Sequence, residues 1–263
     1  MLLEDKVAVL YGAGGAIGGA VARAFAREGA QLFLTGHHLA PVEAVAKDIV
    51  AAGGPAEAAA VDALDEQAVD THLQAVVDTA GPLDISFNAV GIPDTRILGV
   101  PLVELDLERF SLPITTHTRS YFLTARQAAR RMVPRRSGVI MTVTALHSRT
   151  GIPLVGGFGP AQAAKEALTR DLSAELAAQG IRVVGLRPQG IPETRAIKSG
   201  FERLAKATGM TWDQFQQQLA GGTHPRRLST LEELANMAVF MASERASGMI
   251  GTTVNLSMGS LDD

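Results

Sequence analysis

The chain has no cysteine among its 263 residues, which excludes disulfide bonds and thiolate chemistry. Aromatic residues are also scarce, since one Trp and two Tyr leave few platforms on which nucleic-acid bases could stack. The net charge is −3 and no basic run occurs, so we expect no nucleic-acid partner. What is present is an ordinary globular composition, 46% hydrophobic and 19% charged, in a chain long enough for one large domain.

Long apolar runs are missing too, and none approaches the length of a membrane span. The first residues, "MLLEDKVAVLYG", carry acidic side chains where an export signal needs basic ones. Together with the lack of cysteine, this predicts a cytoplasmic protein with no membrane partner. We expect no metal site.

Short apolar runs alternate with longer helical patterns along the whole sequence. Near-continuous apolar strands are typical of a parallel sheet that is covered on both faces, so we predict one doubly wound α/β domain, Rossmann-like, over residues 1–263. The expected strands are 6–11, 31–36, 56–62, 83–91, 138–145, 181–188 and 252–257. The expected helices are 16–30, 41–52, 65–80, 111–134, 158–178 and 230–244.

Residues 189–224 interrupt this alternation directly after the sixth predicted strand. Ligands of doubly wound folds bind at the carboxyl edge of the sheet, where this segment begins. The segment contains Phe201, Met210, Trp212 and Phe215, so we interpret it as a helical lid over a substrate pocket. A packed surface subdomain is the alternative.

A glycine-rich string, "YGAGGAIGGA", follows the first strand and leads into a helix. Gly12, Gly14, Gly15 and Gly18 allow a tight turn and close approach of the backbone to a pyrophosphate, and Ile17 lies among them. The position of the string predicts a dinucleotide site rather than a glycine-rich turn without a ligand.

The second strand ends in Gly36, His37 and His38, where an NAD site places a carboxylate for the ribose 2′-hydroxyl. Without that carboxylate a 2′-phosphate can be accommodated, and the His37 imidazole can hydrogen-bond to it. We therefore expect NADP(H) in preference to NAD(H). The alternative is that both histidines are loop residues facing solvent.

Two further strand ends supply nucleotide contacts in this interpretation. Asp62, after the third strand, is placed to accept a hydrogen bond from an adenine amino group. Asn88 and Gly91 follow the fourth strand, where Asn88 can pair with strand backbone and Gly91 leaves room for the ribose.

These segments together resemble the short-chain dehydrogenase/reductase family over essentially the whole chain. The similar stretches are "YGAGGAIG", "VDA", "LDISFNAVGI", "SGVIMTV", "EALTRDLSAEL" and "GIRVVGLRP". The resemblance implies a seven-stranded parallel sheet, a nicotinamide cofactor, a small alcohol or carbonyl substrate, and a homotetramer or homodimer. It also implies that Thr194 contacts the nicotinamide carboxamide, although "RPQGIPET" is one residue longer than the family pattern. In the glycine-rich string, Ala16 replaces the central glycine of the family fingerprint.

The family's catalytic tyrosine and lysine are four residues apart, and two alignments compete for their positions. Lys165 as the lysine puts Ala161 at the tyrosine. The helix body "ALTRDLSAEL" instead puts Phe158 at the tyrosine and Gln162 at the lysine. The family serine closes the fifth strand about thirteen residues before the tyrosine, and Ala145 has that spacing from Phe158, which favours the second alignment.

The family's helix asparagine belongs to a pattern that ends in phenylalanine, and Phe122 fits its end, which puts His117 at the asparagine. The four catalytic positions then read His117, Ala145, Phe158 and Gln162. Reduction of a carbonyl needs a proton donor, and neither a phenyl ring nor a glutamine amide can titrate. We therefore expect a divergent member that does not transfer hydride by the family mechanism.

Other polar groups lie near the predicted site. His117 faces it from a helix, and "ALHSRT" brings His147 to the loop after the fifth strand. A histidine ring can take up or release a proton near neutral pH, so either ring could assist a non-redox proton transfer such as dehydration, aldol-type cleavage or cyclisation. The alternative is decay to a packed, inert site. Lys165 lies one turn beyond Gln162, so its ammonium could come near the vacated lysine position. The alternative, which we expect, is a salt bridge across a subunit interface, with Glu166 or Glu175 of a neighbour.

Three functional hypotheses remain from the sequence. The first is a nucleotide-binding protein that acts on a small carbonyl or alcohol compound by a rearranged, His-assisted mechanism. The second is a catalytically silent subunit, structural or regulatory, in an oligomer with itself or with an active paralogue. The third is NADPH-dependent ketone reduction with another donor, such as His147 or a water held by His117.

Overall fold

The computed structural model describes residues 1–92, 97–193 and 195–262, and its centre is a seven-stranded sheet. All neighbouring strands are parallel, in the order β3-β2-β1-β4-β5-β6-β7. The strands are β1 (Val7–Tyr11), β2 (Gln31–Gly36), β3 (Ala56–Ala60), β4 (Ile85–Asn88), β5 (Gly138–Val143), β6 (Ile181–Pro188) and β7 (Thr253–Leu256). The predicted doubly wound fold with a seven-stranded parallel sheet is confirmed.

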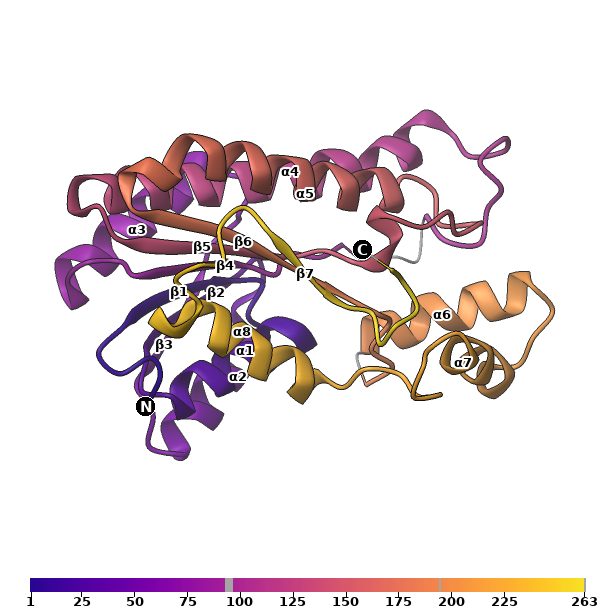
Figure 1. Ribbon diagram of the computed structural model, residues 1–263, viewed down its shortest axis with the longest axis horizontal. Coiled ribbons are helices and arrows are strands. Elements are labelled where there is room, and N and C mark those ends of the chain that lie inside the picture. Colours follow the sequence, from indigo (N-terminus) through magenta and orange to yellow (C-terminus); the bar gives the residue numbers. More distant parts are fainter. Residues whose placement is uncertain (93–96, 194, 263) are drawn as a thin grey trace.

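Helices cover both faces of the sheet, as Figure 1 shows. One layer holds α3 (Glu66–Ala80), α4 (Leu107–Met132) and α5 (Phe158–Leu176), and the other holds α1 (Ala16–Arg27), α2 (Leu39–Ala51) and α8 (Leu231–Ala242). Every residue of β1 and β4 is buried, because each strand contributes side chains to both layers. Burial of apolar side chains in two hydrophobic cores, one on each side of the sheet, stabilises this arrangement.

The helix starts differ in how they are capped. Asp65 accepts hydrogen bonds from the first-turn amides of α3, and Thr230 with Glu233 forms a capping box at α8. At α1 the N-cap is Gly15, which has no side chain to offer, and no acidic residue stands in the first turn. The positive end of α1 is therefore left for another partner.

Strands and helices follow the predicted ranges closely, and two differences have simple causes. β4 ends at Asn88, three residues before the predicted end, where the Asn88 side chain accepts a hydrogen bond from the Val90 amide and so favours a turn. α4 begins at Leu107 instead of near residue 111, because Asp106 caps it through the amide of Arg109.

The predicted insertion at 189–224 contains two helices, α6 (Arg195–Ala207) and α7 (Trp212–Gly221). They project from the end of the molecule near the C-terminus (Figure 1). The C-terminal tail is tied to both ends of the insertion: Gln189 donates to Ser260 Oγ, and the His224 amide donates to the Met258 carbonyl. The role of this segment as a lid stays a prediction.

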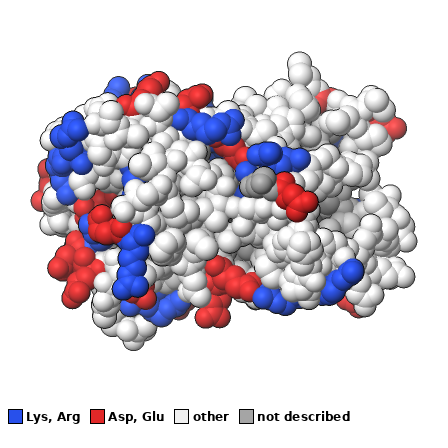
Figure 2. All heavy atoms as spheres, viewed as in Figure 1, with Lys and Arg blue, Asp and Glu red and all other residues white. Residues whose placement is uncertain are grey.

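The surface is uneven in charge. Figure 2 shows charged side chains of both signs over this face, more of them on its left half than on its right half, where α6 and α7 project in Figure 1. Within the described part of the chain, no helix has the length and apolar character needed to cross a membrane.

Candidate functional site

The predicted nucleotide end lies where the strand order reverses, between β1 and β4. Gly12 follows β1 with φ of 74°, and a Cβ there would lie 2.6 Å from the Ala89 carbonyl oxygen. Only glycine tolerates both the backbone conformation and this approach. Gly12 thus brings the glycine-rich loop directly against the end of β4, at the crevice where doubly wound folds bind ligands.

The rest of the glycine-rich loop is tightly packed on its inner side. A Cβ at Gly18 would lie 2.4 Å from the Gly12 carbonyl oxygen, and one at Gly14 would lie 3.0 Å from Pro41. Gly15 and Ala16 are exposed at the uncapped start of α1, and Ile17 is half-buried. The extra methyl of Ala16 therefore does not disturb the packing of the loop, and the free amides of the first turn fit an anionic group.

The second and third strand ends carry the other predicted nucleotide contacts. His37 and His38 are exposed, with their rings edge to face at 4.6 Å. Asp62 is half-buried, and one of its carboxylate oxygens accepts from the Leu64 amide. Both side chains follow strands at the carboxyl edge of the sheet, and their contacts with a nucleotide stay a prediction.

Asn88 is buried at the end of β4 and is fully engaged. Its amide nitrogen donates to Thr124 Oγ1 at 3.0 Å, and its amide oxygen accepts from the Val90 amide at 3.3 Å. It therefore fixes the strand end to α4. Gly91 is exposed, with open space where a side chain would be, and Thr194 lies outside the described residues.

Two of the predicted residues, His117 and His147, have their rings close to the ring of Phe158. Phe158 is the first residue of α5, and its ring centroid lies 5.8 Å from His117 of α4 and 5.1 Å from His147 of the short 3-10 helix Leu146–Ser148. Ala145 directly precedes that short helix, and Gln162 is buried one turn into α5. We name His117, His147 and Phe158 the imidazole cluster.

The His117 ring has an unusual environment. It is 5% exposed, and neither of its nitrogens meets hydrogen-bond geometry with any described residue, although the backbone of Val90 lies near enough to raise its pKa slightly. Burial first, and the charge of Lys165 second, lower the pKa of His117 to about 3. A neutral imidazole results, with one donor and one acceptor free for a ligand or water.

His147 resembles His117 but is more exposed. Burial lowers its pKa to about 4, and its Nδ1 has no partner among the described residues. At neutral pH both rings can donate or accept hydrogen bonds, but neither carries the proton of an imidazolium. The imidazole cluster can therefore polarise a carbonyl group by donating a hydrogen bond from a neutral ring. It is less suited to transferring a proton from an imidazolium.

Glu166, on the same buried face of α5, lies in a fully hydrogen-bonded polar cluster that the sequence did not indicate. Glu166 pairs with Arg187 of β6 at 2.7 and 3.0 Å, and both side chains are 3% exposed. Glu166 Oε1 also accepts from Thr144 at 3.1 Å and from Ser148 at 2.5 Å. We name these four residues the ion-pair cluster; it ties β6 to α5 and to the turn that holds His147.

The expectation for Lys165 is wrong. Its side chain is 1% exposed and donates to the Val143 carbonyl at 2.6 Å, so it is buried within its own chain and cannot reach a neighbouring subunit. Glu166 is likewise taken by Arg187. A signal was available: the buried positions of α5 recur every three or four residues, and they include Gln162, Lys165 and Glu166.

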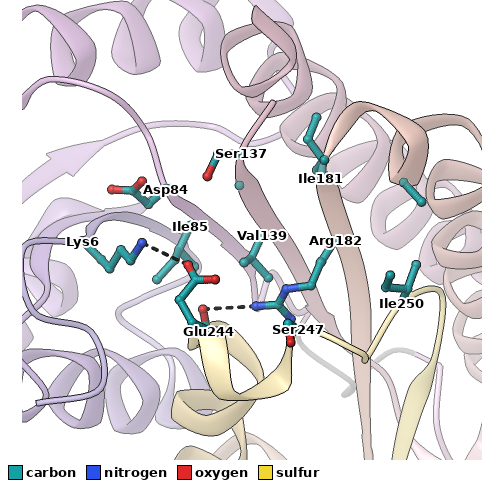
Figure 3. A pocket seen from close by; sticks show the side chains of 14 residues that line it. Lys6, Asp84, Ile85, Ser137, Val139, Ile181, Arg182, Glu244, Ser247 and Ile250 are labelled. Carbon is teal, nitrogen blue, oxygen red and sulfur yellow. Dashed lines mark hydrogen bonds and ion pairs between the residues drawn. The ribbon is translucent and has the colours of Figure 1, made fainter. Parts of the chain in front are cut away.

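A cavity of about 260 Å³ lies at the other edge of the sheet, away from these residues, at the amino ends of β4, β5 and β6. Its charged side chains are engaged within the chain: Lys6 pairs with Glu244, as drawn in Figure 3, and Arg182 donates to carbonyls at the end of α8. No group of three or more potential metal ligands occurs in the part of the chain that the structure describes.

A family model described as enoyl-(acyl carrier protein) reductase matches residues 12–260. The chain belongs to the short-chain dehydrogenase/reductase family. Sorbitol dehydrogenase of Cereibacter sphaeroides is 27% identical over 261 residues, covering 98% of each protein. Secoisolariciresinol dehydrogenase of Forsythia intermedia is 30% identical over 262 residues, 98% of this chain and 89% of the relative. The chain is thus a homologue of oxidoreductases of this family.

Solved structures confirm the fold. NAD⁺-bound xylitol dehydrogenase superposes with a TM-score of 0.93 at 24% identity, covering 98% of this chain and all of the other. A variant of actinorhodin polyketide ketoreductase with NADPH gives 0.89 at 22% identity, with 97% of each chain covered. These two relatives bind different nicotinamide cofactors.

Proposed function

We propose that this family member binds NADP(H) in preference to NAD(H), together with a small carbonyl or alcohol compound, and acts on it by a His-assisted mechanism without a catalytic hydroxyl. The observation that carries this is the unpartnered, buried ring of His117 beside Phe158. A buried polar group without a partner is costly, and a ligand oxygen in hydrogen-bond reach would satisfy it.

The nucleotide part of the proposal rests on the loop before α1. Gly12, Gly14, Gly15, Ile17 and Gly18 would hold the pyrophosphate at the uncapped helix start. Asp62 would accept from the adenine amino group, His37 would donate to the 2′-phosphate, and Asn88 with Gly91 would shape the ribose pocket; Thr194 is the predicted carboxamide contact. A nicotinamide cofactor, when bound, supplies or accepts a hydride.

The chemical part rests on the imidazole cluster. One neutral imidazole, of His117 or His147, would donate its N–H to a substrate carbonyl, and the unprotonated nitrogen of the other ring would accept the proton that leaves the neighbouring carbon, so that the negative charge develops on a hydrogen-bonded oxygen. Phe158 excludes water on one side, and Ala145 leaves space where a serine would stand. Such a site favours non-redox proton transfer, for instance enolisation or dehydration.

Fluorescence titration with NADPH and NADH tests the first part, with tighter binding expected for NADPH. The second part is tested by assaying a panel of small ketones and alcohols for α-proton exchange by NMR, in the wild type and in His117→Ala and His147→Ala. We expect exchange that falls in both variants. Exchange at the wild-type rate in both variants would contradict the mechanism, and NADPH oxidation abolished by His147→Ala would indicate ketone reduction with His147 as donor.

A second candidate, a catalytically silent subunit of an oligomer, is favoured by one surface feature. An apolar groove runs along the outer side of α4 and α5, where Phe122 is 41% exposed and Leu172 and Val133 form part of the lining. We propose that a second copy of this chain covers it. Light scattering of the wild type and of Phe122→Asp tests this, with a dimer or tetramer expected only for the wild type.

A further inference from the structure

The short turn that carries His147 contacts α5 at two places. Ser148, the next residue, donates its hydroxyl to Glu166 Oε1 at 2.5 Å, and Glu166 lies about two helical turns beyond Phe158. At the start of α5, a Cβ on Gly159 would lie 3.2 Å from the His147 carbonyl oxygen, so the backbones of the turn and the helix are already close there. The turn therefore lies along α5 between Phe158 and Glu166.

The carboxylate that accepts the Ser148 hydrogen bond is itself held in place. Glu166 is buried and pairs through both carboxylate oxygens with Arg187, which belongs to β6 of the central sheet. Because the sheet fixes Arg187, the carboxylate cannot follow the turn if the turn moves. A hydrogen bond to a charged oxygen is stronger than one between neutral groups. The Ser148 hydroxyl therefore determines where the turn lies relative to α5.

The ring of His147 has weaker contacts of its own. Its Nδ1 has no hydrogen-bond partner among the described residues, and its centroid lies 5.1 Å from that of Phe158, with the rings at 84°. An edge contact between two rings is weaker than a charge-assisted hydrogen bond. The position of the His147 ring thus depends on the backbone that carries it, and that backbone is held through Ser148.

We propose that Ser148 is a positioning residue of the candidate site: its hydroxyl, bound to the carboxylate of Glu166, keeps the His147 ring against Phe158 in the imidazole cluster. Ser148 acts through the ring and need not touch a substrate. The use of the positioned ring in a reaction rests on the proposed function, whereas the position of the ring does not.

The test follows the His147 ring by NMR in protein with ¹³C-labelled histidine and no substrate, with His147→Ala to assign the signal. In Ser148→Ala the Glu166 carboxylate keeps Arg187, so we expect a folded protein whose His147 ring leaves Phe158. Its signal at pH 7 should then lose the ring-current shift that the phenyl ring causes. Because burial lowers the pKa of His147 to about 4, a ring that becomes exposed should titrate at a pH higher by on the order of 1 unit.

Two further variants separate positioning from a general loss of packing. Ser148→Thr keeps the hydroxyl and should restore the wild-type signal. Thr144→Val removes the other hydroxyl that donates to Glu166 Oε1 and should leave the His147 signal unchanged. Circular dichroism shows that each variant is folded under the conditions of the NMR measurement.

A His147 signal in Ser148→Ala that is the same as in the wild type overturns the proposal. So does a signal displaced equally in Ser148→Thr or in Thr144→Val, because the Ser148 hydroxyl would then not be the cause. The proton-exchange assay under the proposed function is a separate readout. No exchange in the wild type, together with a displaced His147 signal in Ser148→Ala, would remove the function and leave the positioning role.

Discussion

Two neighbouring residues of α5, Glu166 and Lys165, are both buried, and their surroundings differ sharply. Glu166 belongs to the ion-pair cluster, where its carboxylate accepts four hydrogen bonds and pairs with Arg187. Lys165 faces the imidazole cluster, where one carbonyl is its hydrogen-bond partner and the His117 nitrogens have none in the described chain. The polar groups around Glu166 are hydrogen-bonded to one another. Those in the imidazole cluster retain nitrogens without a described hydrogen-bond partner, at the edge of the sheet where ligands bind.

The largest expected effect comes from breaking the ion pair between Glu166 and Arg187. Glu166→Gln leaves the buried Arg187 guanidinium without its counter-ion, so we expect a loss of about 3–5 kcal/mol in the free energy of unfolding, measured in urea. Asp171→Asn, on the exposed side of the same helix, is the control and should change the value by less than about 0.5 kcal/mol. A loss equal to the control would show that the ion-pair cluster contributes no more than surface charges.

Removing the amine of Lys165 should change the free energy of unfolding in the opposite direction. Lys165→Met removes a buried amine without a counter-ion, and we expect about 1–4 kcal/mol of stabilisation at pH 7. Because the native pKa of about 7 lies below the unfolded value of 10.5, the unfolded chain holds more protons between these values, and wild-type stability rises with pH across that window. The advantage of the variant should therefore shrink between pH 7 and pH 10; a constant advantage would contradict a depressed pKa.

Acid should destabilise the imidazole cluster. The pKa of His117 is about 3 in the folded chain and 6.5 unfolded, so its contribution is complete above pH 6.5 and is lost as pH falls toward 3. Between pH 7 and pH 5 this amounts to about 2 kcal/mol, and His147, which is more exposed, contributes less. His117→Leu should remove that part of the acid sensitivity in urea unfolding, whereas His38→Ala, at an exposed ring, should leave it unchanged.

The smallest effect concerns nucleotide choice. His37→Ala removes the proposed donor to the 2′-phosphate, so NADPH affinity should fall roughly 5-fold while NADH affinity stays the same. Fluorescence titration of both nucleotides measures this. Equal losses for the two would mean that His37 does not read the 2′-phosphate.

The sequence predicted the strands and helices well because they depend on local patterns of apolar and polar residues. Continuous apolar runs located β2 and β6 to the residue, and the helical pattern predicted from residue 158 corresponds to α5, which begins at Phe158. The predicted residues His117, His147 and Phe158 are in contact in the structure. These features rest on periodicity and on distances along the chain.

The partners of buried charges were not predictable in this way. Glu166 and Arg187 are 21 residues apart and meet only because β6 lies beside the end of β5. Lys165 was expected in a salt bridge at an interface, and its position on the buried face of α5 was not used. The neutral state of both imidazoles also depends on burial, which a sequence pattern does not quantify.

The central claim is that the reacting end of this site uses imidazoles where the family uses a hydroxyl and an ammonium. Its most direct test is NADPH oxidation over a carbonyl panel by the wild type and by the triple variant Ala145→Ser, Phe158→Tyr and Gln162→Lys. We predict that the wild type binds NADPH without oxidising it and that the triple variant reduces at least one ketone. Ketone reduction by the wild type at a rate that the triple variant does not exceed would contradict the account.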